Sequence, residues 1–171
     1  MGIILITIAQ FAVSIILAAL AAYLGLWLFE RSTRDIDEWK ALREGNVAIG
    51  LTLAAVVVGL AIILQPAVSG ALPSSGDRLV PDLAPRLLPL VTLALILVRA
   101  LLGLLLGVTA ILFAIWLFFH LTRELDEMQE LQKGNTAVAT MLAGVIIAIA
   151  LLVAPVVGGI TNGLLFLFLP Q

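Results

Sequence analysis

The sequence contains no cysteine and only one histidine, and these two shortages remove several kinds of chemistry. Without cysteine the chain cannot form disulfides, thiolate nucleophiles or cysteine-ligated metal and iron–sulfur sites. Charge is scarce too, since 12% of the residues are charged, against about 25% in a soluble domain. Basic residues are not in excess, so nucleic-acid binding has no support. So few charges cannot cover a water-facing surface, which argues against a soluble fold.

What the sequence does contain is apolar: 63% of its residues are hydrophobic, and the mean hydropathy is +1.22. A helix needs about 20 apolar residues to cross a bilayer. Four runs are long enough, and they cover residues 3–29, 47–64, 87–119 and 136–154. Pro85 and Pro89 indicate that the third helix begins near Val91, and Pro155 indicates the end of the fourth. A last apolar run, 164–169, is too short to cross.

The distribution of Lys and Arg predicts how these spans are oriented. Six basic residues fall between the first and second or between the third and fourth spans: Arg31, Arg34, Lys40, Arg43, Arg123 and Lys133. The segment between the second and third spans offers only Arg78 and Arg86. We therefore expect the two charged segments to be cytoplasmic and both termini external. The first run lacks a basic stretch before it, which favours a retained span over a cleaved signal peptide.

The sequence also contains an internal duplication at an offset of 89 residues. Residues 27–70 align without a gap on 116–159, with 18 identities in 44 positions, several of them polar. Each copy holds two spans, so both enter the membrane from the same side. This predicts an all-α, polytopic four-helix bundle with pseudo-twofold symmetry, built from two parallel two-helix repeats. Its parts are a first repeat (1–72), an external linker (73–90), a second repeat (91–161) and a short apolar tail (162–171).

A charged segment connects the two spans of each repeat, at 32–44 and 121–133. Apolar residues recur there every third position, which predicts amphipathic helical hairpins on the cytoplasmic side. Arg34 and Arg123 lie four residues before an acid, as in weak helical ion pairs. The segments share two acidic pairs, Asp37-Glu38 and Asp126-Glu127. These four residues are candidate contacts for a partner or a divalent cation. A solvated acidic face is the favoured alternative, because neighbouring helical residues point about 100° apart and chelate one ion poorly.

Each charged segment ends in Gly-Asn, at Gly45-Asn46 and Gly134-Asn135. A glycine with positive φ ends a helix, and the Asn side chain can then cap the first N–H groups of the next span. We therefore expect a tight helix corner at the membrane surface in both repeats. A contact between the Asn side chains and a polar substrate is the less favoured alternative.

Within the spans, small residues recur at intervals of four, for example Ser14 with Ala18 and Gly103 with Gly107. Such stripes allow close helix packing in lipid, and here they point to self-association. Arg99 falls inside the third span, and Gln10 holds the equivalent position in the first. Snorkelling of Arg99 to the outer headgroups is favoured. The alternative is that Arg99 lines a helix interface, in a polar layer at the depth of Gln10.

Two stretches carry a family resemblance. They are Asp37-Glu38 with Leu42-Arg43-Glu44-Gly45-Asn46-Val47-Ala48-Ile49-Gly50 and Gly59-Leu60-Ala61-Ile62, and Asp126-Glu127 with Gly134-Asn135-Thr136-Ala137. Both stretches combine an acidic pair, the motif Gly-Asn-x-Ala and a span rich in small residues. In this combination the sequence resembles bacterial inner-membrane proteins of the domain of unknown function 350 family. The resemblance implies a four-span protein of the bacterial plasma membrane with no agreed activity. Gly50 and Gly59 correspond to alanines in the second copy, so these glycines are not strictly required.

No base–nucleophile pair or metal-ligand cluster can be assembled around His120, so we expect no enzymatic activity, no cofactor and no metal. The composition favours a structural or assembly protein in the lipid bilayer. Such a protein would form homo-oligomers or dock cytoplasmic or membrane protein partners through its charged hairpins. The alternative is an oligomeric ion channel or small transporter, which the small number of polar residues in the spans disfavours.

Overall fold

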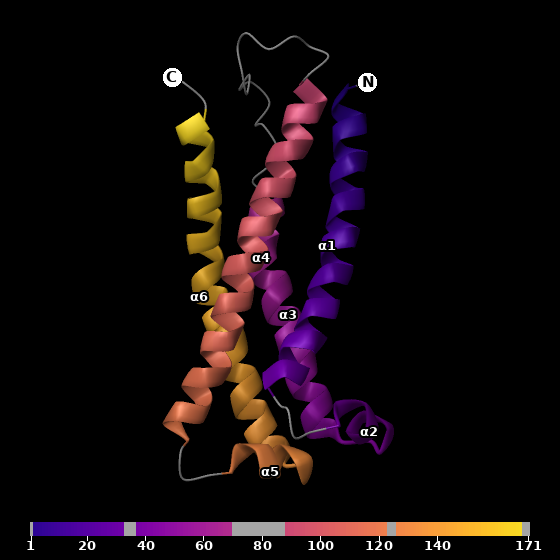
Figure 1. Ribbon diagram of the computed structural model, residues 1–171, viewed down its shortest axis with the longest axis vertical. Coiled ribbons are helices and arrows are strands. Elements are labelled where there is room, and N and C mark those ends of the chain that lie inside the picture. Colours follow the sequence, from indigo (N-terminus) through magenta and orange to yellow (C-terminus); the bar gives the residue numbers. More distant parts are fainter. Residues whose placement is uncertain (1, 33–36, 70–87, 123–125, 169–171) are drawn as a thin grey trace.

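The computed structural model describes residues 2–32, 37–69, 88–122 and 126–168. These residues form helices and no strands. In chain order the helices are α1 (Gly2–Ser32), α2 (Glu38–Arg43), α3 (Val47–Ser69), α4 (Leu88–Leu121), α5 (Glu127–Gln132) and α6 (Thr136–Phe168). The four long helices run side by side, and the short helices α2 and α5 lie together at one end, across the long axis (Figure 1). The first turn of α1 and the last turn of α6 lie at the opposite end.

All four predicted spans are present as helices that are long and apolar enough to cross a membrane. The most apolar windows are Ser14–Arg31, Val47–Ala67, Ile96–Leu121 and Thr136–Gly163. Because the backbone polar groups of a helix bond within the helix, such segments can lie in lipid at no cost in unpaired groups. The prediction of an all-helical chain with four candidate spans is confirmed.

Proline was a poor guide to the helix ends. The prediction that the fourth span ends at Pro155 is wrong, because α6 continues to Phe168 and takes in most of the predicted tail. Pro66 likewise lies inside α3, which runs five residues beyond the predicted Leu64. A proline inside a helix removes one backbone hydrogen bond. In a membrane bundle, neighbouring helices and local adjustments of the helix can satisfy the carbonyl that this leaves free. The third helix begins at Leu88, not near Val91, because a proline in the first turn has no intrahelical N–H bond to lose.

Helix α3 lies at the centre of the bundle. It packs along α1, α4 and α6, and α4 also packs along α6. Among the described residues, α1 packs mainly on α3 and does not pack along α6. A twofold axis would repeat the contact between α3 and α4 as a contact between α6 and α1. The contacts therefore do not follow the predicted pseudo-twofold symmetry. Most of the predicted linker, residues 73–87, lies outside the described residues.

Candidate functional site

The two Gly-Asn corners have nearly the same backbone geometry. The φ angles of Gly45 and Gly134 are 79° and 82°. The N–H of Gly45 donates to Leu42 at 3.1 Å and that of Asn46 to Ala41 at 2.9 Å, which closes the end of α2. The bonds at the end of α5 have the same lengths and the same spacing. Each glycine thus supplies the left-handed conformation that the sequence analysis expects at this point.

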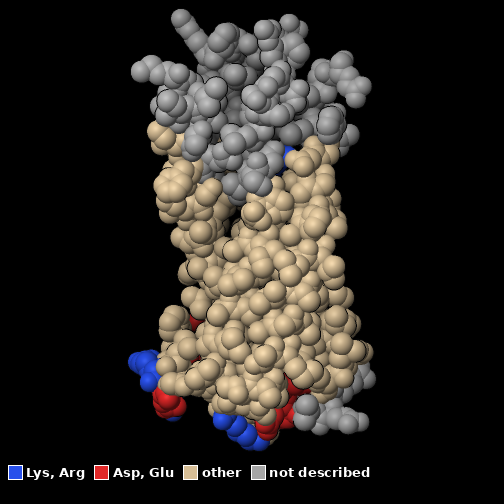
Figure 2. Space-filling model, turned by 180° about the vertical axis from the view of Figure 1, so that it is seen from behind, with Lys and Arg blue, Asp and Glu red and all other residues tan. Residues whose placement is uncertain are grey.

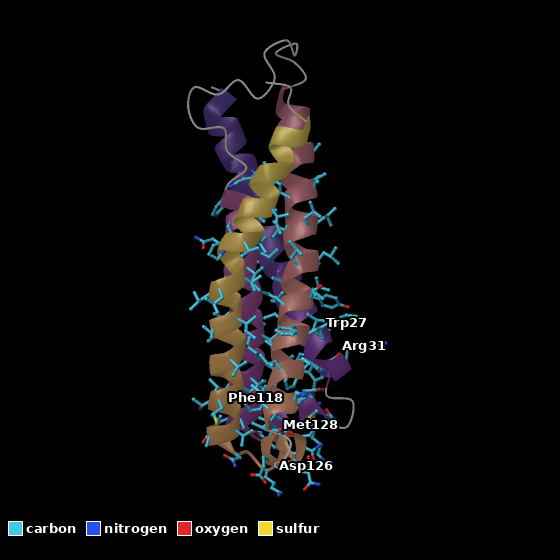
Figure 3. All side chains as sticks on the ribbon, turned by 90° about the vertical axis from the view of Figure 1, so that its left-hand side faces the viewer. Trp27, Arg31, Phe118, Asp126 and Met128 are labelled. Carbon is cyan, nitrogen blue, oxygen red and sulfur yellow. The ribbon has the colours of Figure 1, made fainter. Side chains whose placement is uncertain are left out.

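The aspartate of each acidic pair caps a short helix. A side-chain oxygen of Asp37 accepts from the backbone N–H of Lys40 at 2.9 Å, and Asp126 accepts from Gln129 at 3.1 Å. An Asp at this position satisfies one of the free N–H groups at a helix start. Both aspartates are exposed to solvent, and Asp126 lies at the extreme end of the molecule, with Phe118 further inside (Figure 3).

The glutamate of each pair is buried, so the favoured interpretation of a solvated acidic face is wrong for the two glutamates, whereas the two aspartates are exposed. Glu38 is 6% exposed and Glu127 is 9% exposed. The hydroxyl of Thr122 donates a hydrogen bond to the Glu127 carboxylate. A buried carboxylate needs such donors, because burial without them is costly. The predicted Arg34–Glu38 and Arg123–Glu127 pairs involve arginines outside the described residues.

The two corner asparagines differ in their partners. The Oδ1 of Asn46 accepts from Ile49 N–H at 3.2 Å, and its Nδ2 donates across to α5, to the carbonyls of Leu131 at 2.9 Å and Gln132 at 3.1 Å. Asn46 therefore caps α3 and also joins the two corners. Both polar atoms of the Asn46 side chain therefore have partners within the protein. This bonding gives no support to the alternative of a contact with a polar substrate.

Asn135 bonds within its own corner. Its Oδ1 accepts from Ala137 N–H at 3.1 Å, and its Nδ2 donates to a Glu130 carboxylate oxygen at 2.8 Å. The position equivalent to Glu130 in the first copy is Ala41, which offers Asn46 no side-chain acceptor. Glu130 was not among the predicted site residues, although two signals were present in the sequence: it lies five residues before Asn135, and the first copy has no acid at the equivalent position.

Glu130 also forms an ion pair with Lys133, with Nζ 2.9 Å from Oε1. The hydrogen bond from Asn135, then the bond and charge of Lys133, hold the pKa of Glu130 below its ordinary value. In the other corner, Lys40 and Glu44 lie 4.0 Å apart and are both largely exposed. Such surface pairs contribute little to stability.

The exposed charges at the corners form one surface, which we name the corner face. Its members are Asp37, Lys40, Arg43, Glu44, Asp126 and Lys133. Figure 2 shows that nearly all the charged residues in view gather at this end, below a broad band of residues that carry no charge. The corner face is therefore the charged surface at this end of the described bundle.

Arg99 lies at a helix interface, and the favoured prediction that it snorkels to the headgroups is wrong. It is 2% exposed, its Nε donates to the carbonyl of Thr161 at 3.0 Å, and its guanidinium donates to Asn162 Oδ1. Two acceptors on α6 therefore hold the charge between α4 and α6, which is less costly than leaving it unpaired in lipid. The side chain of Gln10 lies outside the described residues, and the described part of the predicted polar layer consists of Arg99 and its partners on α6.

The described residues contain no group of three or more His, Cys, Asp or Glu side chains that could hold a metal ion. His120 is exposed and stacks on Trp116, with ring centroids 5.1 Å apart. Trp116 and the equivalent Trp27 are both exposed near the corner end, where aromatic rings suit the boundary between lipid and water. Thus the acidic pairs cap and pack the corners and are not gathered into a single ligand set in the described structure.

An open apolar groove runs along the outer side of α4 and α6. We name it the outer groove, and it has a volume of about 420 Å³. Its lining is made by Leu106, Thr109, Ala110, Phe113, Ile149, Leu152, Val153, Val156, Val157 and Ile160. The hydroxyl of Thr109 donates to its own helix at Leu105, at 2.9 Å. The groove thus offers van der Waals surface and almost no hydrogen-bonding groups.

Four long apolar helices, joined by short charged corners at one end, define this chain as a multi-pass membrane protein. Its family follows from a direct match: the sequence model described as Domain of Unknown Function (DUF350) covers residues 3–157. The chain therefore belongs to the DUF350 family, as the Gly-Asn corners and acidic pairs predict. No curated protein and no solved structure matches it.

Proposed function

We propose that this protein is a structural membrane protein that self-associates in the bilayer and docks partners through its corner face. One observation carries the proposal: the Asn46 side chain joins the two corners into one platform, on which the charged side chains face outward. Among these charges, Lys40 and Glu44 form only a loose ion pair of 4.0 Å, and both side chains are largely exposed. They are therefore placed to select a partner by charge complementarity.

The interior of the described bundle supports a structural role over the alternative of a channel or small transporter. Its buried polar side chains are Glu38, Thr52, Arg99, Glu127 and Thr161. The two threonines donate to carbonyls of their own helices, at 3.0 Å for Thr52 and 2.8 Å for Thr161. Arg99 is bonded to α6. Isolated, satisfied groups of this kind do not make a continuous polar lining within one copy, so an ion channel would have to form between copies.

We further propose that the corner face is cytoplasmic, that both termini are external and that the membrane is the bacterial inner membrane. The bias of Lys and Arg toward the corners supports this orientation. In this proposal the protein has no enzymatic activity and uses no cofactor. The two parallel repeats, each with its amphipathic corner segment, are the proposed origin of the platform.

Self-association is tested by the mass of the purified protein in mild detergent and in lipid nanodiscs. A chain of 18.1 kDa that self-associates gives a protein mass of two or more copies by light scattering with the detergent contribution subtracted. A mass of one copy in both media contradicts the proposal. Liposomes containing the protein should remain silent to several ions; a steady current that changes in Arg99→Ala would favour the channel instead.

Docking is tested on side chains that the fold does not need. Substitution of Asp37 or Glu38 would disturb a cap or a buried group, so the better variant replaces Lys40, Arg43 and Glu44 together by Ser. We expect the set of proteins recovered by cross-linking in intact membranes to lose members, with insertion and oligomer mass unchanged. Gln129→Ser, also exposed but uncharged, is the matched control. An unchanged set of cross-linked proteins would reject docking through this face.

A further inference from the structure

Helix α4 packs very closely on α3 through two glycines. A Cβ atom added at Gly103 would lie 2.7 Å from the Cβ of Ala67, and one added at Gly107 would lie 3.3 Å from a methyl carbon of Leu60. The neighbouring surface of α3 includes Ile63, which is fully buried, as Ala67 is. The two glycines of α4 thus lie directly against side chains of α3, a common mode of helix packing in lipid.

The equivalent surface in the second half of the chain is open. With the offset of 89 residues, Ile63 corresponds to Leu152 and Ala67 to Val156. Leu152 is 75% exposed and Val156 is 58% exposed, and both line the outer groove. The same place in the repeat is therefore covered by α4 in the first half and uncovered in the second.

The packing also indicates why no described helix of the same copy covers this surface. If a twofold axis related the halves, α1 would cover the α6 surface as α4 covers the α3 surface. Among the described residues α1 does not pack along α6. Two surfaces that do not meet within one copy can meet between copies, as in the heterologous contacts that build rings and filaments.

We propose that α1 of a second copy packs into the outer groove and repeats there the contact that α4 makes with α3. The residues of α1 that correspond to Gly103 and Gly107 are Ser14 and Ala18. Ala18 is exposed, Ser14 is half-buried, and only 22% of the span window of α1 is buried in one copy. In the assembly Ala18 faces Leu152, and Ser14 faces Val156 of the neighbouring copy.

This contact is heterologous, because α1 of one copy meets α4 and α6 of the next. Successive copies therefore form a closed ring or an open row in the plane of the membrane. The larger Val156 in place of Ala67 sets the helices farther apart than α3 and α4 are. The inference rests on the proposed self-association and specifies its surface.

The absence of cysteine in the native chain allows a direct test by disulfide cross-linking. The variants Ala18→Cys and Leu152→Cys are made singly and together, and membranes are oxidised with copper phenanthroline in air. The doubly substituted chain should give a ladder of cross-linked oligomers. The two single variants, co-expressed, should give a cross-linked dimer, and each alone should give several-fold less. Leu151→Cys, exposed beside Leu152, replaces Leu152→Cys as the matched control and should cross-link several-fold less with Ala18→Cys.

A second variant tests the contact without cysteine. Leu152→Trp fills the groove and should shift the mass in detergent toward one copy, whereas Leu151→Trp should not. A mass of several copies with no cross-link between positions 18 and 152, or with strong cross-links of position 18 to itself, overturns the inference and leaves self-association standing. A mass of one copy for the unmodified chain overturns both.

Discussion

Helices α1 and α4 occupy equivalent places in the two copies of the repeat, yet they differ in how deeply they pack. In α1, 22% of the span window is buried, whereas in α4 the buried share is 39%. The glycines of α4 allow its backbone to approach α3, whereas α1 has Ser14 and Ala18 at those positions. Both helices approach α3 closely, but at different depths: α4 through Gly103 and Gly107, and α1 through Gly25, where an added Cβ would lie 3.2 Å from a methyl carbon of Val57.

The largest expected effect is at the closest approach of α4. Gly103→Ala places a Cβ in contact with the Cβ of Ala67, and neither atom can rotate away. We expect a loss of about 2 kcal/mol in unfolding free energy, the usual size of overpacking. Steric trapping or SDS titration in micelles measures it.

Gly144→Ala in α6 is the matched control for Gly103→Ala, because a Cβ at Gly144 meets nothing within 4 Å. Its stability should be unchanged or slightly higher. Equal stabilities of the two variants would show that the close approach of α4 to α3 is absent in solution.

A smaller effect distinguishes the two corners. Asn46→Ala removes a helix cap and two bonds to α5, so we expect a loss of about 2 kcal/mol or less. Asn135→Ala removes a cap and one bond to a partly exposed carboxylate, which predicts a loss of about 1 kcal/mol. The same unfolding experiment measures the loss of unfolding free energy in both variants. A larger loss in Asn135→Ala than in Asn46→Ala would contradict the described bonding between the corners.

The smallest effect is the pH dependence of the second corner. The pKa of Glu130 is lowered in the folded chain, so its contribution is present above the unfolded pKa, about 4.3, and is lost as pH falls through the folded pKa. The difference in stability between the native chain and Asn135→Ala should therefore shrink in acid. Glu130→Gln should abolish this change; an unaltered pH dependence in Glu130→Gln would assign it to another group.

Much of this fold follows from the sequence, because lipid demands long apolar helices and leaves few alternatives. The corner glycines are equally readable, since a residue with positive φ between two helices is most often Gly. The predicted helix ends at the prolines were wrong, because in a membrane bundle neighbouring helices and local adjustments satisfy the backbone groups that proline leaves without a bond. Pro66 instead packs beside Gly158 of α6, where an added Cβ would lie 3.1 Å from its ring.

Contacts between distant parts of the chain were not readable. The burial of Glu38 and Glu127, the bond from Asn46 to α5 and the α6 partners of Arg99 all depend on which helices meet. Apolar stripes on several faces leave that choice open. A buried Arg does require acceptors, so Thr161 and Asn162 could have been sought as its partners, but nothing in the periodicity selects α6 over α3.

The bond that joins the corners has a consequence for the order of synthesis. When the first pair of spans has entered the membrane, Asn46 can already cap α3, but the two carbonyls that its amide group reaches belong to residues 131 and 132. Those residues are made only after the third span is complete. The final joining of the two corners therefore waits for the second half of the chain, and until then the side-chain amide of Asn46 lacks its two acceptors on α5.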